Sequence, residues 1–566
     1  MEIWRIDVEK QRLFREPIPE KWLRLGGRAL SAQIMVDEVP PTCQPLGSEN
    51  KLIYAPGLLV GHMISSCDRI SIGGKSPLTG GIKESNAGGR TGFQLASLGI
   101  KALIIEGKPR DDSLWLIHLS PAGARFETAG GLRGLGVYDA ASHLLDQFSE
   151  RSAVSLIGPG AEMGLASAGI QNVDKDGVPS RIAARGGLGA VLGSKGIKAI
   201  MIDASEGSQP PLVNEEAFRA AQKAYNKALL GHPQTQTYAE YGTAAMTSMC
   251  NAYGSLPTRN FSTGQFEEAD KLSGEYMRAL LLERGGESET THACMKGCVI
   301  RCSNVYGGQD GKAIVSPLEY ETIGLMGSNL GIDDLDDVAR LNWEANDLGL
   351  DTIELGAALG VAAEAGLMDF GDGKRALELV EEIRSGTPLG RTLGSGAEAA
   401  GQELGVERVP AVKGQAMSAY DPRAIKGTGV TYATSPQGAD HTAGLTIRAD
   451  VDHTDPKGQA DLSRDAQIKM AGYDSLGACL FSGFGFSVST SSVPDLLNAR
   501  YGWEVDEGIL LELGRTALQL EREFNRGAGF TSADDRIPEW MTREPLSPSN
   551  AVFDVPEVEL DSLFDW

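Results

Sequence analysis

Short apolar runs separated by glycine, proline and asparagine fill the first 205 residues of the chain. Five of these runs are rich in aliphatic and aromatic residues and are bounded by turn-forming residues, which is typical of β-strands. They lie at residues 51–57, 69–74, 101–107, 113–120 and 198–204. This part of the chain is therefore predicted to form a mostly β domain with a few helices.

The apolar positions change to a helical repeat after a polar, proline-containing stretch at residues 205–218. There, Asn214 precedes Glu215 and Glu216, which predicts an N-cap followed by acidic residues in the first turn of a helix. The apolar spacing predicts helices at residues 215–230, 334–348, 352–366 and 373–385.

Three domains are predicted from these changes of pattern. The polar stretch places one boundary near residue 207, and a glycine-rich segment places the second near residue 408. The predicted domains are residues 1–207, 208–408 and 409–566. The predicted fold class is α+β, with an N-terminal β-rich domain followed by two mainly helical domains.

Composition narrows the classes of function. Glycine accounts for 71 of 566 residues, without the repeat of collagen or the proline content of a low-complexity coil. The net charge of −24 repels phosphate backbones and anionic lipid, so neither nucleic acid nor a membrane surface is an expected partner. No apolar run predicts a membrane span, and the charged N-terminal segment does not resemble a secretory signal. We expect a cytoplasmic protein that binds small molecules and other proteins.

Three of the seven cysteines lie within nine residues, as Cys294, Cys298 and Cys302. Thiolates at this spacing can converge on one metal centre, either zinc or an iron-sulfur cluster, and the spacing does not decide between the two. The best candidate for a fourth ligand is Cys479, since Asp474 and Gly477 before it suggest a fixed turn. We interpret Cys43 and Cys250 as ordinary buried residues.

Two glycine-rich strips, residues 69–92 and 181–195, also carry arginine and lysine. Closely spaced glycines let backbone N–H groups approach a ligand, and the flanking cations suit an anionic one such as a phosphate-bearing cofactor. Tight turns in a β domain are an equally good explanation of these strips on their own. The second strip lacks the Gly-x-Gly-x-x-Gly fingerprint and a surrounding strand-helix-strand pattern, so a Rossmann site is rejected.

The ordered set of motifs resembles the tungsten-containing aldehyde:ferredoxin oxidoreductase family over nearly the whole chain. The motifs that carry the resemblance are residues 26–28, 37–41, 75–80, 84–89, 185–195, 319–322, 419–423 and 432–435, followed by Asp440 and His441. The resemblance implies a β-rich domain that binds a tungsten (or molybdenum) bis-pyranopterin, Mg²⁺ that bridges the pterin phosphates, a nearby 4Fe-4S cluster, and two helical domains above the cofactor.

The resemblance also assigns residues to these cofactors. Arg69 would lie between cluster and pterin, and two family turns that bind pterin rings correspond to residues 346–351 and 474–479. The implied pterin-binding residues are Arg69, Asn86, Ala87, Gly88, Ala184, Arg185, Gly186, Asn346, Gly349, Leu350, Asp351, Asp474, Gly477 and Ala478. The implied cluster ligands are Cys294, Cys298, Cys302 and Cys479.

The chain departs from the family pattern in three places. The usual cysteine run is Cys-x2-Cys-x3-Cys, whereas this chain has Cys-x3-Cys-x3-Cys. In the two turns, Asn346 replaces an acid and Ala478 replaces leucine. Some members bind an iron at a dimer interface through Glu-x-x-His; the candidate here, Glu289 with His292, adjoins the cysteines, so no such iron is expected.

Aldehyde oxidation needs a base and a hydrogen-bond donor beside the metal. Glu319 or Glu321 is predicted to be the base, with Glu319 preferred and the other a structural partner, and His441 to be the donor and proton relay. His62 and His453 are interpreted as structural.

Three functional hypotheses follow. The favoured one is an enzyme that oxidises an aldehyde to a carboxylic acid and passes electrons to ferredoxin or a small polyferredoxin-like iron-sulfur subunit, within a homo- or hetero-oligomer. The alternative is the catalytic subunit of a tungsten-dependent reductase of the aromatic acyl-CoA ring type. The third is a chain that has lost its cofactor and serves in electron transfer or as a scaffold.

Overall fold

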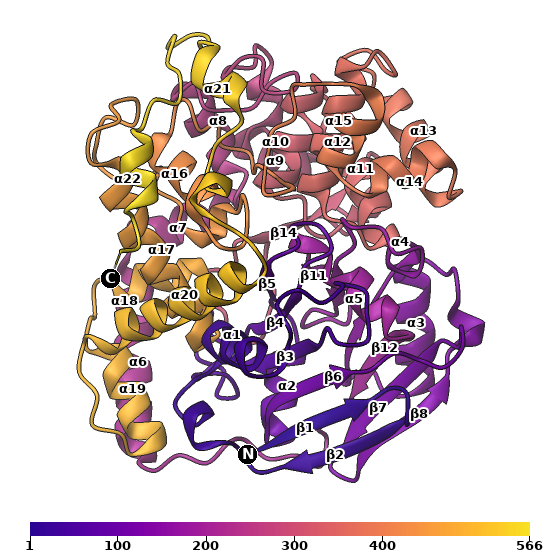
Figure 1. Ribbon diagram of the computed structural model, residues 1–566, viewed down its shortest axis with the longest axis vertical. Coiled ribbons are helices and arrows are strands. Elements are labelled where there is room, and N and C mark those ends of the chain that lie inside the picture. The colour runs from indigo at the N-terminus through magenta and orange to yellow at the C-terminus, as the bar shows by residue number, and fades with distance from the viewer. Residues whose placement is uncertain (566) are drawn as a thin grey trace.

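The computed structural model describes residues 1–565, and its N-terminal part is built on two six-stranded sheets in the lower half of Figure 1. The first sheet has the order β2-β1-β6-β3-β4-β5, in which β1 and β6 are parallel and all other neighbours antiparallel. Its strands are β1 (Glu2–Asp7), β2 (Arg12–Glu16), β3 (Leu52–Pro56), β4 (Ile70–Lys75), β5 (Ile82–Ala87) and β6 (Ile100–Glu106).

The second sheet has the order β11-β10-β9-β12-β7-β8, in which β12 and β7 are parallel. Its strands are β7 (Trp115–Ser120), β8 (Gly123–Thr128), β9 (Ala153–Leu156), β10 (Ile170–Asn172), β11 (Arg181–Ala183) and β12 (Ile197–Ile202). The helices of this part are α1 (Gly27–Glu38), α2 (Thr91–Ser97), α3 (Val137–Gln147), α4 (Pro159–Glu162) and α5 (Leu188–Ser194).

Strand β3 shows why the first sheet is so apolar, since every one of its residues is buried. Ile53 and Ala55 pack in one cluster with residues of α1, and the alternate residues Leu52 and Tyr54 pack in another with residues of α2 and α5. Because successive strand residues point to opposite faces, helices cover both faces of this sheet.

Helices dominate from residue 215 onward. The middle of the chain contains α6 (Glu215–Gly231), α7 (Pro233–Tyr241), α8 (Ala245–Ala252), α9 (Gly274–Arg284), α10 (Tyr320–Met326), α11 (Leu335–Leu348), α12 (Thr352–Glu364), α13 (Gly373–Arg384), α14 (Pro388–Gly394) and α15 (Ala397–Leu404), with a small sheet of β13 (Glu289–His292), β14 (Ser303–Gly307) and β15 (Ala313–Val315). Figure 1 shows α10 to α15 above the two large sheets.

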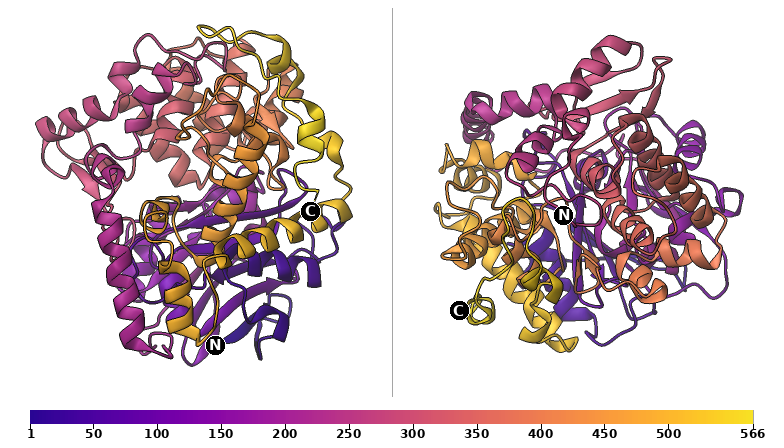
Figure 2. Two further views of the ribbon diagram at one scale, coloured as in Figure 1. Left: turned by 90° about the vertical axis from the view of Figure 1, so that its left-hand side faces the viewer. Right: turned by 90° about the horizontal axis from the view of Figure 1, so that it is seen from above.

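The last third of the chain returns to the N-terminal sheets. It contains β16 (Ala411–Val412), β17 (Gln415–Ala416), α16 (Lys426–Thr434), α17 (Gln459–Leu476), α18 (Gly483–Phe486), α19 (Ser492–Tyr501), α20 (Ile509–Gly527), α21 (Glu539–Arg543) and α22 (Glu557–Asp561). Helix α20 packs on α1 and α17. In Figure 2, α6 runs down beside the sheets, where α18 and α19 pack against it.

These elements confirm the α+β fold class. The five predicted strands correspond to β3, β4, β6, β7 and β12, and the four predicted helices to α6, α11, α12 and α13. The predicted cap of α6 is present, since the N–H of Ala217 donates to Oδ1 of Asn214 at 3.0 Å. Within residues 1–565, no helix combines the length and the apolar character that a membrane crossing requires.

Candidate functional site

A cavity of about 310 Å³ lies where the two sheets meet the helical part of the molecule, near the labels β5 and β11 in Figure 1. Most residues predicted for the site line this cavity: Arg69, Asn86, Ala87, Gly88, Ala184, Arg185, Cys294, Cys302, Glu319, Glu321, Asn346, Asp351, His441 and Cys479. The lining does not include Gly186, Cys298, Gly349, Leu350, Asp474, Gly477 or Ala478. The structure thus brings together segments that are up to about 400 residues apart in the chain.

The four predicted cluster ligands come from two segments. Cys294, Cys298 and Cys302 lie in the loop between β13 and β14, and Cys479 follows α17. The loop before β4 holds the two segments together: the N–H of Cys479 donates to the carbonyl of Ser66 at 2.7 Å, and the Ser66 hydroxyl lies 3.5 Å from Sγ of Cys298. Burial and the neighbouring Cys298 raise the pKa of the Cys294 thiol to about 12.

The cysteine sulfurs are too far apart for one zinc ion. A tetrahedral zinc with Zn–S bonds of about 2.3 Å needs sulfurs about 3.8 Å apart. Over residues 1–565, no three cysteine sulfurs lie within 4.8 Å of one another. The wider spacing suits a multi-iron cluster better than a mononuclear site.

His292, next to the cysteine loop, belongs to an ion-pair network. Its Nδ1 lies 2.9 Å from Glu289 and its Nε2 lies 3.3 Å from Asp174, which also faces Arg181 at 4.0 Å. Hydrogen bonds that His292 donates to Asp174 and Glu289 raise its pKa. The network connects the β10–β11 loop to the segment that carries the cysteines.

Arg69 joins the cysteine side of the cavity to the first glycine strip. Its guanidinium donates to Oδ1 of Asn86 and, at 3.2 Å, to the Asn86 carbonyl. The Asn86 amide donates to Asp474 at 3.1 Å, and Asp474 forms an ion pair with Arg28 at 3.2 Å. Burial lowers the pKa of the half-buried Arg69, but neighbouring groups that include Asp474 and Glu84 raise it above its ordinary value overall. Arg69 thus lies between the cysteines and the first glycine strip, and its role toward cluster and pterin stays a prediction.

Arg185 has the corresponding position in the second strip. Its Nε lies 3.0 Å from Oδ2 of Asp351, and its other nitrogens donate to the Ser418 hydroxyl at 3.0 Å and to the Ala416 carbonyl. The following Gly186 has φ of +80°, in the left-handed region that favours glycine. A Cβ there would lie 2.5 Å from the Lys83 side chain.

The two predicted ring-binding turns have the same local structure. Gly349 ends α11 with φ of +73°, and Gly477 ends α17 with φ of +75°. A left-handed glycine at this position terminates a helix and redirects the chain. Asp351 follows the first turn and caps α12, and Cys479 follows the second. Leu350 and Ala478 point away from the cavity into the core.

The three predicted catalytic residues lie together at one end of the cavity. Nε2 of His441 is 3.2 Å from Oε1 of Glu321, and its Nδ1 is 2.8 Å from the Ser418 hydroxyl. The second oxygen of Glu321 accepts the N–H of Ala419 at 2.8 Å. Glu319 has one looser contact, 3.8 Å from Arg181, and its side chain is 39% exposed to the enclosed cavity. Burial raises the pKa of Glu319.

A second pocket of about 150 Å³ adjoins this end of the cavity, and Glu319, Glu321 and His441 line both. Its other lining residues are mostly aromatic or apolar: Tyr238, Thr243, Met246, Tyr320, Tyr420, Leu445, Arg448, Leu480, Phe481 and Phe484. The rings of Tyr238 and Phe481 lie 4.3 Å apart. No sequence motif predicted this pocket. Its aromatic residues come from four separate segments of a chain with 6% aromatic residues.

The residues of the large cavity fit a polar, phosphate-bearing group. Glu84 Oε1 and Arg181 Nε are buried there without a hydrogen-bond partner. Buried polar atoms normally have partners, so these two atoms mark where a ligand's polar atoms belong. Gly88 brings the backbone close to the cysteines, because a Cβ at this position would lie 3.2 Å from Sγ of Cys294.

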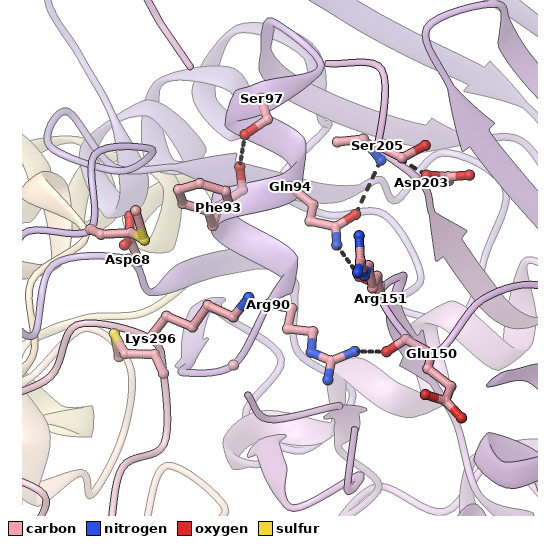
Figure 3. Close-up of a pocket in the computed structure, with 14 residues that line it drawn as sticks. Asp68, Arg90, Phe93, Gln94, Ser97, Glu150, Arg151, Asp203, Ser205 and Lys296 are labelled. Atoms are coloured by element: carbon pink, nitrogen blue, oxygen red, sulfur yellow. Dashed lines mark hydrogen bonds between the residues drawn. The ribbon is translucent and has the colours of Figure 1, made fainter. Parts of the chain in front are cut away.

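A third cavity, of about 500 Å³, lies on the outer side of the cysteine loop (Figure 3). Met295 and Lys296 of that loop line it, together with Arg90, Gln94 and Arg151. Arg90 donates to the Glu150 carbonyl and Gln94 to the Arg151 carbonyl at 2.6 Å. The predicted cysteines and catalytic residues do not line this cavity.

Comparison with known proteins covers almost the entire chain. Residues 3–204 match the family model of the aldehyde ferredoxin oxidoreductase N-terminal domain, and residues 220–565 match that of domains 2 and 3. These matches define an oxidoreductase. The chain belongs to the aldehyde ferredoxin oxidoreductase family, which confirms the resemblance of its motifs.

Similar curated proteins include two tungsten-containing aldehyde ferredoxin oxidoreductases. That of Pyrococcus furiosus is 32% identical, with 94% of this chain and 89% of the relative covered, and that of Thermococcus kodakarensis is 31% identical with the same coverage. The aliphatic sulfonate oxidoreductase WOR-like subunit of Pyrococcus furiosus is 26% identical over 91% of this chain and 84% of its own.

Among solved structures, the active-site complex BamBC of benzoyl coenzyme A reductase, in complex with 1,5-dienoyl-CoA, has the same fold. Its TM-score is 0.80 at 20% identity, with 100% of this chain and 93% of that chain covered.

Proposed function

We propose that the protein oxidises a small aldehyde to the carboxylic acid and passes the electrons to ferredoxin or to a partner iron-sulfur subunit. The observation that carries this proposal is the position of Glu319, Glu321 and His441, which line both the large cavity and the aromatic pocket. A substrate in the pocket would present its carbonyl to these residues and to the cofactor together. The printed activity of the curated relatives agrees with this reaction.

The cofactor of this proposal is a tungsten or molybdenum bis-pyranopterin. Arg69 and the strip from Asn86 to Gly88 would hold one pterin, and Ala184, Arg185 and Asp351 the other, with Mg²⁺ between the phosphates. Support comes from the orphaned polar atoms of the cavity and from its three arginines, Arg69, Arg181 and Arg185. When bound, the metal-pterin supplies Lewis acidity and takes up two electrons, which a 4Fe-4S cluster on the four cysteines passes on singly.

The chain's own residues manage water and protons. The balanced reaction is RCHO + H₂O → RCOOH + 2 H⁺ + 2 e⁻, so a base must remove protons as oxygen is added. Glu319 suits this role because its carboxylate is open to the cavity and has only the loose contact with Arg181. Glu321 has both oxygens occupied and suits a positioning role toward His441. His441 contacts Glu321 through Nε2 and Ser418 through Nδ1, so it would donate to the substrate oxygen by exchanging its contact with Glu321 for one with the substrate.

The aromatic pocket indicates the size of the substrate. A cavity of about 150 Å³ lined by apolar side chains accommodates a molecule the size of benzene. Short aliphatic or simple aromatic aldehydes fit this volume. The preference for the aldehyde reaction over ring reduction of an aromatic acyl-CoA comes from the curated relatives.

Metal analysis and a dye-linked assay test the proposal. The purified protein should contain tungsten or molybdenum in near-stoichiometric amount, and it should reduce a viologen dye when given short aldehydes. Protein without either metal would sink the proposal and favour a chain that has lost its cofactor. If the metal-loaded protein fails to reduce the dye with every aldehyde tested, the result would favour the reductase alternative.

The electron partner is proposed to dock over the cysteine loop, at the cavity of Figure 3. Lys296 lines this cavity and is exposed, and Arg301 of the same loop is exposed too, although the whole chain has a net charge of −24. Local cations on an acidic protein favour an acidic partner such as a ferredoxin. Lys296→Glu should raise the KM for ferredoxin and leave viologen reduction unchanged, while Lys374→Glu on α13 should change neither.

The compartment is proposed to be the cytoplasm. The three cysteines outside the proposed cluster, Cys43, Cys67 and Cys250, are buried free thiols. Reducing compartments keep thiols in this state.

A further inference from the structure

Glu84 is the buried acid of the cofactor cavity that lacks a hydrogen-bond partner at one of its oxygens. Its side chain lines the cavity, the residue is 6% exposed, and its Oε1 accepts no hydrogen bond. Burial of an unpaired carboxyl oxygen costs roughly 1–3 kcal/mol or more. A cost of this kind at a binding site indicates that the missing partner is a ligand.

The position of Glu84 follows from the pairing of β5. Glu84 and Asn86 are two residues apart in this strand, so both side chains point to the same face, and both line the cavity. Glu84 pairs with Gly73 of β4 in the sheet register. The rigid sheet thus fixes the direction of the Glu84 carboxyl.

The nearby cations already have other partners. Arg28 donates to both oxygens of Glu521, at 2.7 and 2.8 Å, and to Asp474 at 3.2 Å. Lys83, next to Glu84 in the strand, points to Asp440 at 2.7 Å. No arginine or lysine within residues 1–565 forms an ion pair with Glu84 within 4.0 Å, which distinguishes it from the neighbouring acids.

We propose that Glu84 is a further pterin-binding residue, whose free carboxyl oxygen accepts a hydrogen bond from the nitrogen edge of a pterin ring. That edge carries an amino group and a ring N–H side by side. A carboxyl group can accept hydrogen bonds from this pair of donors, as it does from the paired N–H groups of a guanidinium. This inference depends on the proposed pterin cofactor. Glu84 begins the motif at residues 84–89 but was not among the residues that the resemblance assigned to the pterin.

Pterin content is the direct readout, measured per chain by oxidative release and fluorescence of the pterin. Glu84→Ala removes the acceptor and should lower pterin content several-fold. Glu84→Gln keeps an acceptor oxygen and should retain most of the pterin. Glu84→Ala with pterin content equal to that of the wild type would overturn the inference.

A comparison without cofactor separates binding from folding. In a host that cannot make pterin, Glu84→Ala should be at least as stable to heat as the wild type, because it removes an unpaired buried group. A lower melting temperature in this host would show a structural role and would also overturn the inference.

Glu162 provides the matched control. It is a partly buried acid of the same part of the chain, but Lys198 contacts it at 2.5 Å and the Gly134 N–H donates to it at 2.9 Å. Glu162→Gln should lower the melting temperature and keep the pterin, the opposite of Glu84→Ala. Absence of pterin from the wild type itself would refute the proposed function. If the wild type and Glu84→Ala contain equal amounts of pterin, only the role of Glu84 is refuted.

Discussion

Nε2 of His441 lies 3.2 Å from Oε1 of Glu321, and this contact joins two segments that are 120 residues apart in the chain. Glu321 is in the first turn of α10, while His441 begins a short 3-10 turn capped by Asp440. With Ser418 on the other ring nitrogen, both sides of the imidazole are fixed. A histidine held in this way presents one orientation to whatever occupies the cavity.

Replacing His441 should therefore impair turnover more than folding. His441→Asn removes the ring but keeps a polar side chain in a partly exposed position, so the melting temperature should change little. Loss of one general acid or hydrogen-bond donor typically costs 10²- to 10⁴-fold in rate. Steady-state kinetics with an aldehyde and a viologen dye would measure this loss, and a kcat within threefold of the wild type would contradict the role.

Protonation of Glu319 should cause the fall of kcat/KM at low pH, which is the acid limb of the pH profile. Burial raises the pKa of this carboxyl above its ordinary value of 4.5. Because a base acts as the carboxylate, kcat/KM should fall as pH is lowered through that raised pKa. Glu319→Gln should reduce kcat/KM and abolish this limb. Retention of the limb in the Glu319→Gln enzyme would assign the base to another group, with Glu321 the first candidate.

The turns at Gly349 and Gly477 and most of the cofactor residues were predicted through the family resemblance. The strands and the cysteine triplet, in contrast, depend on local patterns. Apolar runs predicted β3, β6 and β12, and the spacing of Cys294, Cys298 and Cys302 predicted a metal centre. Each of these signals lies within a few residues of the feature that it predicts.

The aromatic pocket and the isolation of Glu84 were not predictable in this way. Tyr238, Tyr420 and Phe481 line one pocket only after three separate segments pack together, and no spacing in the chain relates them. Likewise, Glu84 lacks a partner only because Arg28 and Lys83 bind other acids. Such features depend on contacts between distant segments, which a single sequence does not show.

Removal of one sulfur should abolish the cluster. Cys298→Ser takes away a predicted ligand, whose Sγ lies 3.5 Å from the Ser66 hydroxyl, and iron should fall from about four atoms per chain to a small fraction of that. Cys43→Ala is the matched control, since Cys43 is a buried thiol of the N-terminal core. Iron analysis and visible absorption should show loss in the first variant only. Equal iron in both would exclude Cys298 as a ligand.

Bulk at Gly88 should displace the cofactor before it destabilises the fold. A Cβ at this position would lie 3.2 Å from Sγ of Cys294 and 3.3 Å from Cε of Met295, so a larger side chain enters the space between strip and cysteines. Gly186 is a less selective test, because its left-handed φ and its contact with Lys83 would also cost about 1–2 kcal/mol of folding free energy.

We expect Gly88→Val to purify as a folded chain with little tungsten or pterin and a melting temperature close to that of cofactor-free wild type. Gly130→Val is the control, since a Cβ at Gly130 meets no atom within 4 Å. It should keep metal, pterin and activity. Full metal content in Gly88→Val would show that the first glycine strip does not approach the cofactor, and the assignment of this strip would then be wrong.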